Sequence, residues 1–287
     1  MVELFQRIKA ATRAPTAEER ALDLLELHEA RPGITEATLG SWTTATGQSG
    51  YDLLVQRVPL HARAVLELGA GNGPLLERLV VAHPELERVI GVDPCAADLA
   101  LARDRLGDRV ELRQERVESL GLEDASVDAV LTHHVFYLFD PPEPAVRQIA
   151  RVLRPGGTFA TAHWTFEAKS HALFAELMEV FARLTCRDAP HFAGWGDQRL
   201  FDRDQLATLL RAGGLGQPVI EEHVLAIAEP TQLLCQRLMG FFYSVELQSP
   251  ETQRELCAEW SALLAATDSG DGLARLDFPF SIVTSEP

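Results

Sequence analysis

The stretch Val65-Leu-Glu-Leu-Gly-Ala-Gly-Asn-Gly-Pro-Leu75 decides the fold of this chain. Its first part, residues 64–68, is a short apolar run that is typical of a buried strand in a parallel sheet. The glycines that follow let the backbone turn sharply and approach a ligand without an intervening Cβ. Pro74 suits the first position of a helix, because its ring presets φ and the N–H that it lacks would have no partner inside the helix. The stretch therefore predicts a strand, a ligand-binding turn and a helix.

The spacing of the glycines narrows the kind of ligand. Nicotinamide, flavin, ATP and sulfonium cofactors are all bound by glycine-rich turns between a strand and a helix. A dinucleotide fingerprint has its third glycine three residues after the second, whereas Gly69, Gly71 and Gly73 follow one another at intervals of two. The strand also carries Glu67, whose carboxylate repels a pyrophosphate and attracts an ammonium group, directly or through water. These features favour a cofactor with an amino-acid end.

A second acid ends the next predicted strand. Residues 88–93 read as a strand that closes on Asp93, and 93 − 69 = 24 residues separate this acid from the first glycine. A carboxylate at that place can accept hydrogen bonds from both hydroxyls of a ribose. Right-handed crossovers bring the ends of parallel strands to one rim of the sheet, so we expect Glu67 and Asp93 to face the same ligand.

Three segments together resemble the class I S-adenosylmethionine (SAM) dependent methyltransferases. They are Glu67-Leu-Gly-Ala-Gly-Asn-Gly73, Gly91-Val-Asp93 and Leu153-Arg-Pro-Gly-Gly157, and the resemblance extends over residues 62–163. It implies an α/β fold, with a doubly wound, mostly parallel seven-stranded Rossmann-like sheet, and SAM as the cofactor with S-adenosyl-L-homocysteine (SAH) as product. The alternative left open is a Rossmann-like domain that binds another nucleotide.

The resemblance also assigns the cofactor site. The residues implied to bind SAM are Glu67, Gly69, Ala70, Gly71, Asn72, Gly73, Asp93, Pro94, Arg116, Val117, Thr132 and His133. Arg116 departs from the family pattern, which often has an aspartate there that accepts from the adenine amino group, and arginine cannot accept a hydrogen bond. It can lie flat on the adenine face while the Val117 backbone N–H reads the ring edge, or it can face solvent. Glu115 is an alternative acceptor.

Histidines supply the predicted proton acceptors. His133, His134 and His163 are the candidate catalytic bases, because imidazole titrates near neutrality. Adjacent side chains of an extended segment point to opposite faces, so we expect His133 to face the cofactor or the substrate and His134 to face the other. The residues predicted to contact substrate are Tyr137, Trp164, Trp195, Trp42 and Tyr51. For Trp42 and Tyr51, simple packing is the alternative.

Alternating strand and helix patterns divide the chain into four parts. We predict an N-terminal helical cap over residues 1–60, a SAM-binding core over 61–165, an inserted helix with a substrate loop over 166–200, and the rest of the core over 201–287 with a helical lid at about 230–266. The alternative for the apolar faces of that lid is a dimer interface or ordinary core.

Local signals support the outer parts of this division. Leu4, Phe5 and Ile8 fall at helical spacing, and a second helix is expected after the capping box Thr16-Ala-Glu-Glu19. In the resembling family, such N-terminal segments fold over the cofactor, and inserts of this size form a lid in members with small hydrophobic acceptors. The inserted loop contains His191, Phe192 and Trp195.

Composition excludes several classes of partner. The formal net charge of −16 over 287 residues argues against nucleic acid and against an anionic membrane surface, which both require clustered Lys and Arg. No metal site is predicted, because His133, His163 and His191 are scattered along the chain. The cysteines form no Cys-x-x-Cys pair, so we expect reduced, mostly buried thiols and a cytoplasmic location. They are Cys95, Cys186, Cys235 and Cys257.

The resemblance therefore implies a SAM-dependent methyltransferase that moves a methyl group to the O, N or C atom of a small, largely apolar metabolite, in biosynthesis or secondary metabolism. A small-molecule substrate and a possible homodimer are the partners expected. Three alternatives stay open: a SAM-binding enzyme that catalyses a cyclisation or rearrangement without methyl transfer, a cofactor-binding module without turnover, and a metal-assisted enzyme that holds a catechol.

Overall fold

A single seven-stranded sheet organises the molecule. The computed structural model describes residues 13–188 and 195–287; the predicted helix at Leu4 to Ile8, and also His191 and Phe192, lie outside the described residues. The strands run in the order β3-β2-β1-β4-β5-β7-β6, and β7 is antiparallel to both of its neighbours. The predicted doubly wound, mostly parallel sheet is confirmed. Its strands are β1 (Ala64–Leu68), β2 (Arg88–Val92), β3 (Glu111–Arg113), β4 (Val127–His133), β5 (Leu153–Trp164), β6 (Val219–Glu229) and β7 (Ala274–Ser285).

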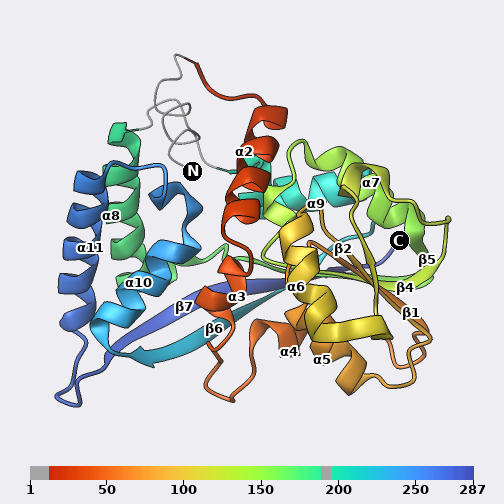
Figure 1. Cartoon of the computed structure of the whole chain (residues 1–287), viewed down its shortest axis with the longest axis horizontal. Coiled ribbons are helices and arrows are strands. Elements are labelled where there is room, and N and C mark those ends of the chain that lie inside the picture. The colour runs from red at the N-terminus through yellow and green to blue at the C-terminus, as the bar shows by residue number, and fades with distance from the viewer. Residues whose placement is uncertain (1–12, 189–194) are drawn as a thin grey trace.

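Helices cover both faces of the sheet and one of its ends (Figure 1). Apolar residues of α4, α5 and α6 pack on one face, and those of α7 and α9 pack on the other. α8, α10 and α11 gather at one end of the molecule (Figure 1), where they share the hydrophobic core of α4, α5 and α6, and α8 and α11 pack on β7. The α-helices of the described residues are α2 (Ala17–Ala30), α3 (Ile34–Leu39), α4 (Gly50–Val55), α5 (Pro74–Ala82), α6 (Ala96–Leu106), α7 (Pro142–Val152), α8 (Ala172–Asp188), α9 (Arg203–Ala212), α10 (Thr231–Phe241) and α11 (Pro250–Ala265).

The register of the central strands places the two predicted acid positions side by side. In the parallel pair of β1 and β2, Glu67 lies opposite Gly91 and Leu68 lies opposite Val92. Both strands therefore end at the same level, so that the glycine loop after β1 and Asp93 after β2 share one rim. All five residues of β1 are buried, as expected for a central strand with helices on both faces.

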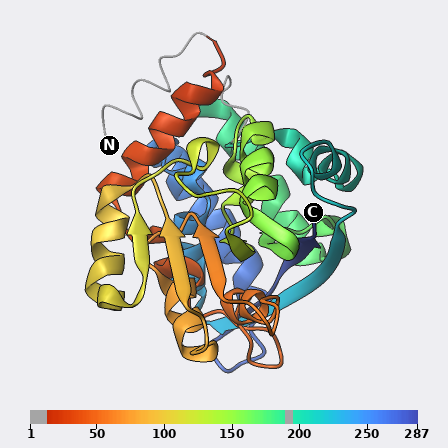
Figure 2. The same cartoon turned by 90° about the vertical axis from the view of Figure 1, so that its right-hand side faces the viewer.

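The N-terminal segment begins as its capping signal predicts and then covers that rim. The Thr16 side chain accepts from the Glu19 N–H while the Glu19 carboxylate accepts from the Thr16 N–H, which satisfies two free donors at the start of α2. Figure 2 shows α2 lying across the ends of the strands to which the arrowheads of β1, β2 and β3 point. The expectation that the N-terminal segment folds over the ligand rim therefore agrees with the structure.

The helices predicted as a lid are for the most part core. The apolar faces of α10 and α11 are buried against each other, α10 also packs on α3, and α11 packs on α8 and β7. Cys235 of α10 and Cys257 of α11 are free thiols whose Sγ atoms lie 3.2 Å apart. Among the described residues of this insert, Tyr243, in the turn after α10, lines the cavity, and Phe241 meets the ring of the cavity residue His134 at 5.8 Å. Within the described ranges, no helix is both long and apolar enough to cross a membrane.

Candidate functional site

A cavity opens at the carboxyl ends of β1, β2 and β4. Its floor is the glycine loop after β1, its sides are the segments that follow β2, β3 and β4, and its roof is formed by α2, the start of α3 and Tyr243. This is the position at which open α/β sheets bind their ligands.

The glycine loop is tight on one side and open on the other. Gly69, Gly71 and Gly73 all have positive φ, at +71°, +51° and +84°. A Cβ at Gly69 would lie 2.6 Å from a Val135 side-chain carbon, whereas a Cβ at Gly71 would meet no atom within 4 Å. Gly71 therefore leaves a free space in the cavity next to its own backbone. Gly73 does not line the cavity, because it faces α6, where a Cβ would lie 2.8 Å from Leu106.

Asp93 braces this loop. Its Oδ2 accepts the Gly71 N–H at 2.9 Å, and its Oδ1 accepts the Cys95 N–H at 2.8 Å. Burial raises the pKa of the Asp93 carboxyl, and these two hydrogen bonds oppose the rise. Each carboxylate oxygen keeps further acceptor capacity, so the side chain can still receive ribose hydroxyls.

Glu67 is a buried carboxyl with a free oxygen. It is 2% exposed, and its Oε2 has no hydrogen-bond partner in the described part of the chain. Burial, and secondarily the charge of Asp93, raise its pKa well above the usual value. A buried polar atom without a partner is costly, and a cationic group in the cavity would relieve that cost. The loop, Asp93 and Glu67 therefore fit the ribose and the ammonium group of SAM.

The two adjacent histidines lie together, which corrects the expectation that they face opposite sides. His134 has a left-handed φ of +54°, so the alternation of the strand ends at this residue. The rings of His133 and His134 are in contact at 4.8 Å and perpendicular, and both line the cavity. His133 also stacks on Tyr51 at 3.9 Å.

Both histidines are neutral in the folded chain. Burial, and secondarily the charge of the neighbouring histidine, lowers the pKa of His133 well below its usual value. Burial, with a smaller contribution from His163, lowers the pKa of His134 to about 3. The Nδ1 of His134 is buried and makes no hydrogen bond to the residues that the structure describes. This atom can therefore exchange a hydrogen bond with a ligand in the cavity.

Several predicted site residues lie away from the cavity, which corrects their assignment. His163 is fully buried, stacks on Phe166 at 5.3 Å and has its Nδ1 3.1 Å from the Trp164 carbonyl oxygen. Trp42 packs on Phe278 and donates to Glu229. Of the five predicted substrate residues, only Tyr51 lines the cavity. The others, with the predicted cofactor residue Thr132, lie outside its lining: Trp42, Tyr137, Trp164 and Trp195.

We expect His163→Phe to remove part of the acid sensitivity of the protein. Burial lowers the pKa of His163 to about 4. The unfolded chain therefore binds a proton below about pH 6.5 that the folded chain does not, and the stability of the wild type falls with pH in this window. Between about pH 7.5 and about pH 5, the variant should gain about 2 kcal/mol of unfolding free energy relative to the wild type. Urea unfolding at both pH values measures this gain.

The control for this experiment is His61→Gln, because His61 is exposed. It should show the same pH dependence as the wild type. A constant difference between His163→Phe and the wild type at both pH values would contradict the neutral, buried state of His163.

The segment after β3 reaches the cavity, as predicted, but the side chains of Arg116 and Glu115 form contacts within their own segment. Arg116 and Val117 line the cavity. Arg116 is half exposed and pairs with Glu118, which agrees with the solvent-facing alternative. Glu115 accepts the Gly121 N–H at 2.8 Å and is thereby committed to its own turn.

Three residues of the cavity roof are not signalled by any local motif. His28 donates through Nδ1 to Asp98 Oδ2 at 3.1 Å, and Asp98 Oδ1 accepts the Gly33 N–H at 2.7 Å. The Tyr243 hydroxyl lies 2.6 Å from the Thr35 hydroxyl. His28, Asp98 and Tyr243 all line the cavity. Their partners are far away in the sequence, so spacing could not have revealed them.

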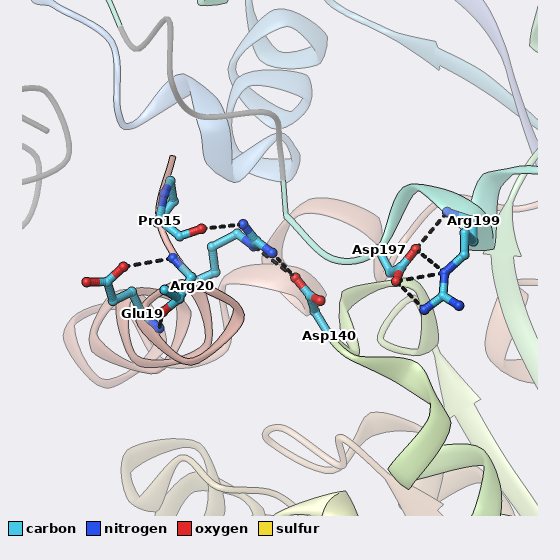
Figure 3. A network of polar contacts seen from close by, with 7 residues as sticks. Pro15, Glu19, Arg20, Asp140, Asp197 and Arg199 are labelled. Atoms are coloured by element: carbon cyan, nitrogen blue, oxygen red, sulfur yellow. Dashed lines mark hydrogen bonds and ion pairs between the residues drawn. The ribbon is translucent and has the colours of Figure 1, made fainter. Parts of the chain in front are cut away.

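An ion pair fastens the other end of α2 to the core. Arg20 reaches from α2 to Asp140, with its Nε 2.9 Å from Oδ2, and also donates to the Pro15 carbonyl (Figure 3). Asp140 lines the cavity and stands just before α7. Asp197 is bound instead by Arg199 (Figure 3).

We expect Arg20→Met to loosen the roof. A hydrogen bond to a charged group contributes about 1.5–3 kcal/mol, so opening of α2 should become about 10-fold or more frequent. Hydrogen exchange of the α2 amides measures this opening. The matched control is Arg13→Met, since among the described residues Arg13 pairs with the half-exposed Glu19 of its own segment and with a neighbouring carbonyl. Equal exchange in the two variants would contradict the role of the ion pair.

Among the described residues, no group of three or more His, Cys, Asp or Glu side chains is arranged to hold a metal ion.

Comparison with known proteins places the core in one family. The family model described as "Methyltransferase domain" matches residues 66–161. An uncharacterized methyltransferase of Mycobacterium tuberculosis is 38% identical over 126 residues, which cover 44% of this chain and 49% of that relative. The chain thus spans about half the length of the curated relatives it matches.

Solved structures show the same fold. A putative methyltransferase from an antibiotic biosynthesis pathway of Anabaena variabilis aligns with a TM-score of 0.59 and 16% identity, over 88% of this chain and all of that one. A phosphoethanolamine N-methyltransferase of Haemonchus contortus, in complex with SAH, aligns with a TM-score of 0.55 and 16% identity, over 95% of this chain and 60% of that one. Residues 66–161 therefore match the methyltransferase domain family, and the solved structures extend the likeness in fold to most of the chain.

Proposed function

We propose that this chain transfers a methyl group from SAM to a small, largely apolar metabolite. The observation that carries the proposal is the composition of one cavity. The Asp93-braced glycine loop, the Glu67 carboxyl, whose Oε2 has no hydrogen-bond partner among the described residues, and two neutral histidines all face it.

The chain's own residues supply binding and alignment. SAM, when bound, contributes a methyl group on a positively charged sulfur, which is already an activated donor. Asp93 and the backbone of the loop would hold its ribose, and Glu67 would hold its ammonium group. Orienting two reactants in this way can lower the activation free energy by up to about 7–11 kcal/mol. The roof formed by α2 and Tyr243 excludes water from the reacting groups.

His134 and His133 are the residues we assign to the acceptor. A neutral imidazole can accept a hydrogen bond from a hydroxyl or an amine and so orient its lone pair. The low pKa of His134 makes it a weak base. It would therefore accept a hydrogen bond from the O–H or N–H group of the substrate, and would remove that proton only when methyl transfer has made the group more acidic. His163 and the outlying tryptophans have no part in this assignment.

The walls of the cavity support a small apolar acceptor. The α2 side chains that line it are Ala21, Leu24 and Leu25, and Leu138 and Phe139 line it after β4. These surfaces bury hydrocarbon, which stabilises an apolar ligand by about 25 cal/mol per Å². The net charge of −16 disfavours nucleic acid as acceptor.

The test begins with mass spectrometry of ligands that co-purify with the protein. Incubation with methyl-deuterated SAM and fractionated small-molecule extracts then follows, with Asp93→Ala as the matched control. SAH together with a deuterium-labelled product, absent in the control, supports the proposal. SAM that is bound but never consumed, while a substrate is isomerised, replaces it with the rearrangement alternative. A bound nicotinamide nucleotide overturns both.

A further inference from the structure

An aspartate–histidine pair stands in the roof of the cavity, outside the glycine loop and the two acid-bearing strand ends. The Nδ1 of His28, on α2, donates to Asp98 Oδ2 at 3.1 Å. Asp98 is 2% exposed, and its other oxygen is held by the Gly33 N–H at 2.7 Å. The carboxylate is therefore fixed by the backbone before it binds the imidazole.

This arrangement sets the chemistry of the second ring nitrogen. A carboxylate oxygen can only accept, so Nδ1 carries a proton, and in the neutral form of the ring the lone pair is on Nε2. Nε2 makes no hydrogen bond to the described residues, and the His28 side chain keeps 21% of its surface exposed while it lines the cavity. The Tyr243 ring meets the imidazole edge-on at 5.4 Å and is itself held by Thr35. His28 thus presents a fixed acceptor to the cavity.

The acceptor lies near the cofactor's expected ribose. Asp98 is in the first turn of α6, five residues after Asp93, and the Cys95 N–H between them is bound to Asp93 Oδ1. His28 and Asp93 therefore approach the same part of the cavity, one from the roof and one from the strand rim. The two Asp93 oxygens already accept backbone N–H groups. A second hydrogen-bond acceptor can therefore share the two hydroxyl groups of the ribose with Asp93.

We propose that His28 is a cofactor-contacting residue whose Nε2 accepts a hydrogen bond from one ribose hydroxyl of SAM. Asp98 and Tyr243 are positioning residues that hold its tautomer and orientation. This inference rests on the proposed use of SAM. Its consequence is that the N-terminal helix closes on the ribose itself, so that the cavity roof distinguishes a ribose from a deoxyribose.

The experiment is titration calorimetry with SAH and with its 2′-deoxy and 3′-deoxy analogues. Against SAH, His28→Phe should bind about 10-fold more weakly than the wild type, as the loss of one hydrogen bond predicts. For the analogue that lacks the contacted hydroxyl, His28→Phe and the wild type should bind alike. His28→Gln should recover part of the affinity for SAH, because its amide oxygen can accept.

Glu29→Gln is the matched control. Glu29 lies next to His28 on α2 and accepts the Ala96 N–H at 2.7 Å, but it does not line the cavity. It should bind SAH within about two-fold of the wild type, since an amide oxygen replaces the lost carboxylate oxygen as acceptor.

The failures are distinguishable. If His28→Phe lowers the affinity for SAH and for both analogues by the same factor, the ring only packs and the ribose contact is overturned while SAM binding stands. Unchanged affinity in His28→Phe also overturns it. A wild-type protein that binds no SAH overturns the proposed function, and the ribose contact with it.

Discussion

Asp93→Ala is expected to bind SAH at least 100-fold more weakly than the wild type. The side chain has two tasks, since it braces the glycine loop through the Gly71 N–H and is the expected acceptor for the ribose hydroxyls. Hydrogen bonds to a charged group contribute about 1.5–3 kcal/mol each, and about 2.7 kcal/mol corresponds to a 100-fold change in affinity. Titration calorimetry with SAH measures the loss.

Asp93→Asn separates these two tasks. Its amide oxygen can still accept from one backbone N–H group, whereas the charge and half of the acceptor capacity are lost. We expect an intermediate affinity for SAH with little change in unfolding temperature. Unchanged affinity in Asp93→Ala would remove the ribose assignment.

Gly69→Ala is expected to lower the unfolding free energy by about 2–5 kcal/mol, a large part of the total for a typical domain. Two independent costs add. The backbone has φ +71°, which an L side chain adopts at a cost of about 1–2 kcal/mol. The new methyl group would also lie 2.6 Å from Val135, and overpacking of this kind costs about 1–3 kcal/mol. Urea unfolding measures the sum.

A second substitution and a matched control resolve the two costs. Val135→Ala in the Gly69→Ala background removes the two closest atoms, the Val135 Cγ carbons at 2.6 and 2.7 Å, so it should restore most of the overpacking part and leave the backbone part. Gly71→Ala has only the backbone cost, because its Cβ meets no atom within 4 Å, but that Cβ enters the cavity and should weaken SAH binding. Equal destabilisation in Gly69→Ala and Gly71→Ala would contradict the contact with Val135.

The sequence predicts the core well because the signals are local. The apolar run before Gly69 and the proline after Gly73 are neighbours along the chain, so the strand, the loop and α5 follow from a dozen residues. The position of Asp93 can be predicted in the same way. It follows the next strand along the chain, and the pairing of β1 with β2 brings the ends of the two strands together. The predicted helices in the inserts are also present at their expected places.

The roof of the cavity is beyond such reasoning. His28 meets Asp98 across 70 residues, and Thr35 meets Tyr243 across 208. None of these residues has a motif around it, and a histidine on an amphipathic helix is an ordinary surface residue by pattern. Only the packing of α2 on α6 creates the contact.

Two other differences have physical causes that no pattern contains. His134 adopts a left-handed backbone, an uncommon state for a residue other than glycine, and this single dihedral brings it against His133. His163 is a candidate base by residue type, but the structure buries it completely and stacks it on Phe166, outside the cavity lining. The spacing of apolar residues along α10 and α11 is the same for a helix that covers a ligand as for one that fills a core. That spacing could therefore not distinguish the predicted lid from ordinary core.

The roof has a kinetic consequence. It is fastened at four places along α2 and the residue after it: Arg20 to Asp140, His28 to Asp98, Glu29 to the Ala96 N–H, and Arg31 to Glu246. Under the proposed function, these contacts would open once in each catalytic cycle to release SAH, and lid opening limits turnover in many enzymes. We therefore expect a burst in pre-steady-state experiments, in which the first equivalent of product forms faster than any later one. Arg20→Met should raise the rate of the slow phase that follows the burst and leave the amplitude of the burst unchanged.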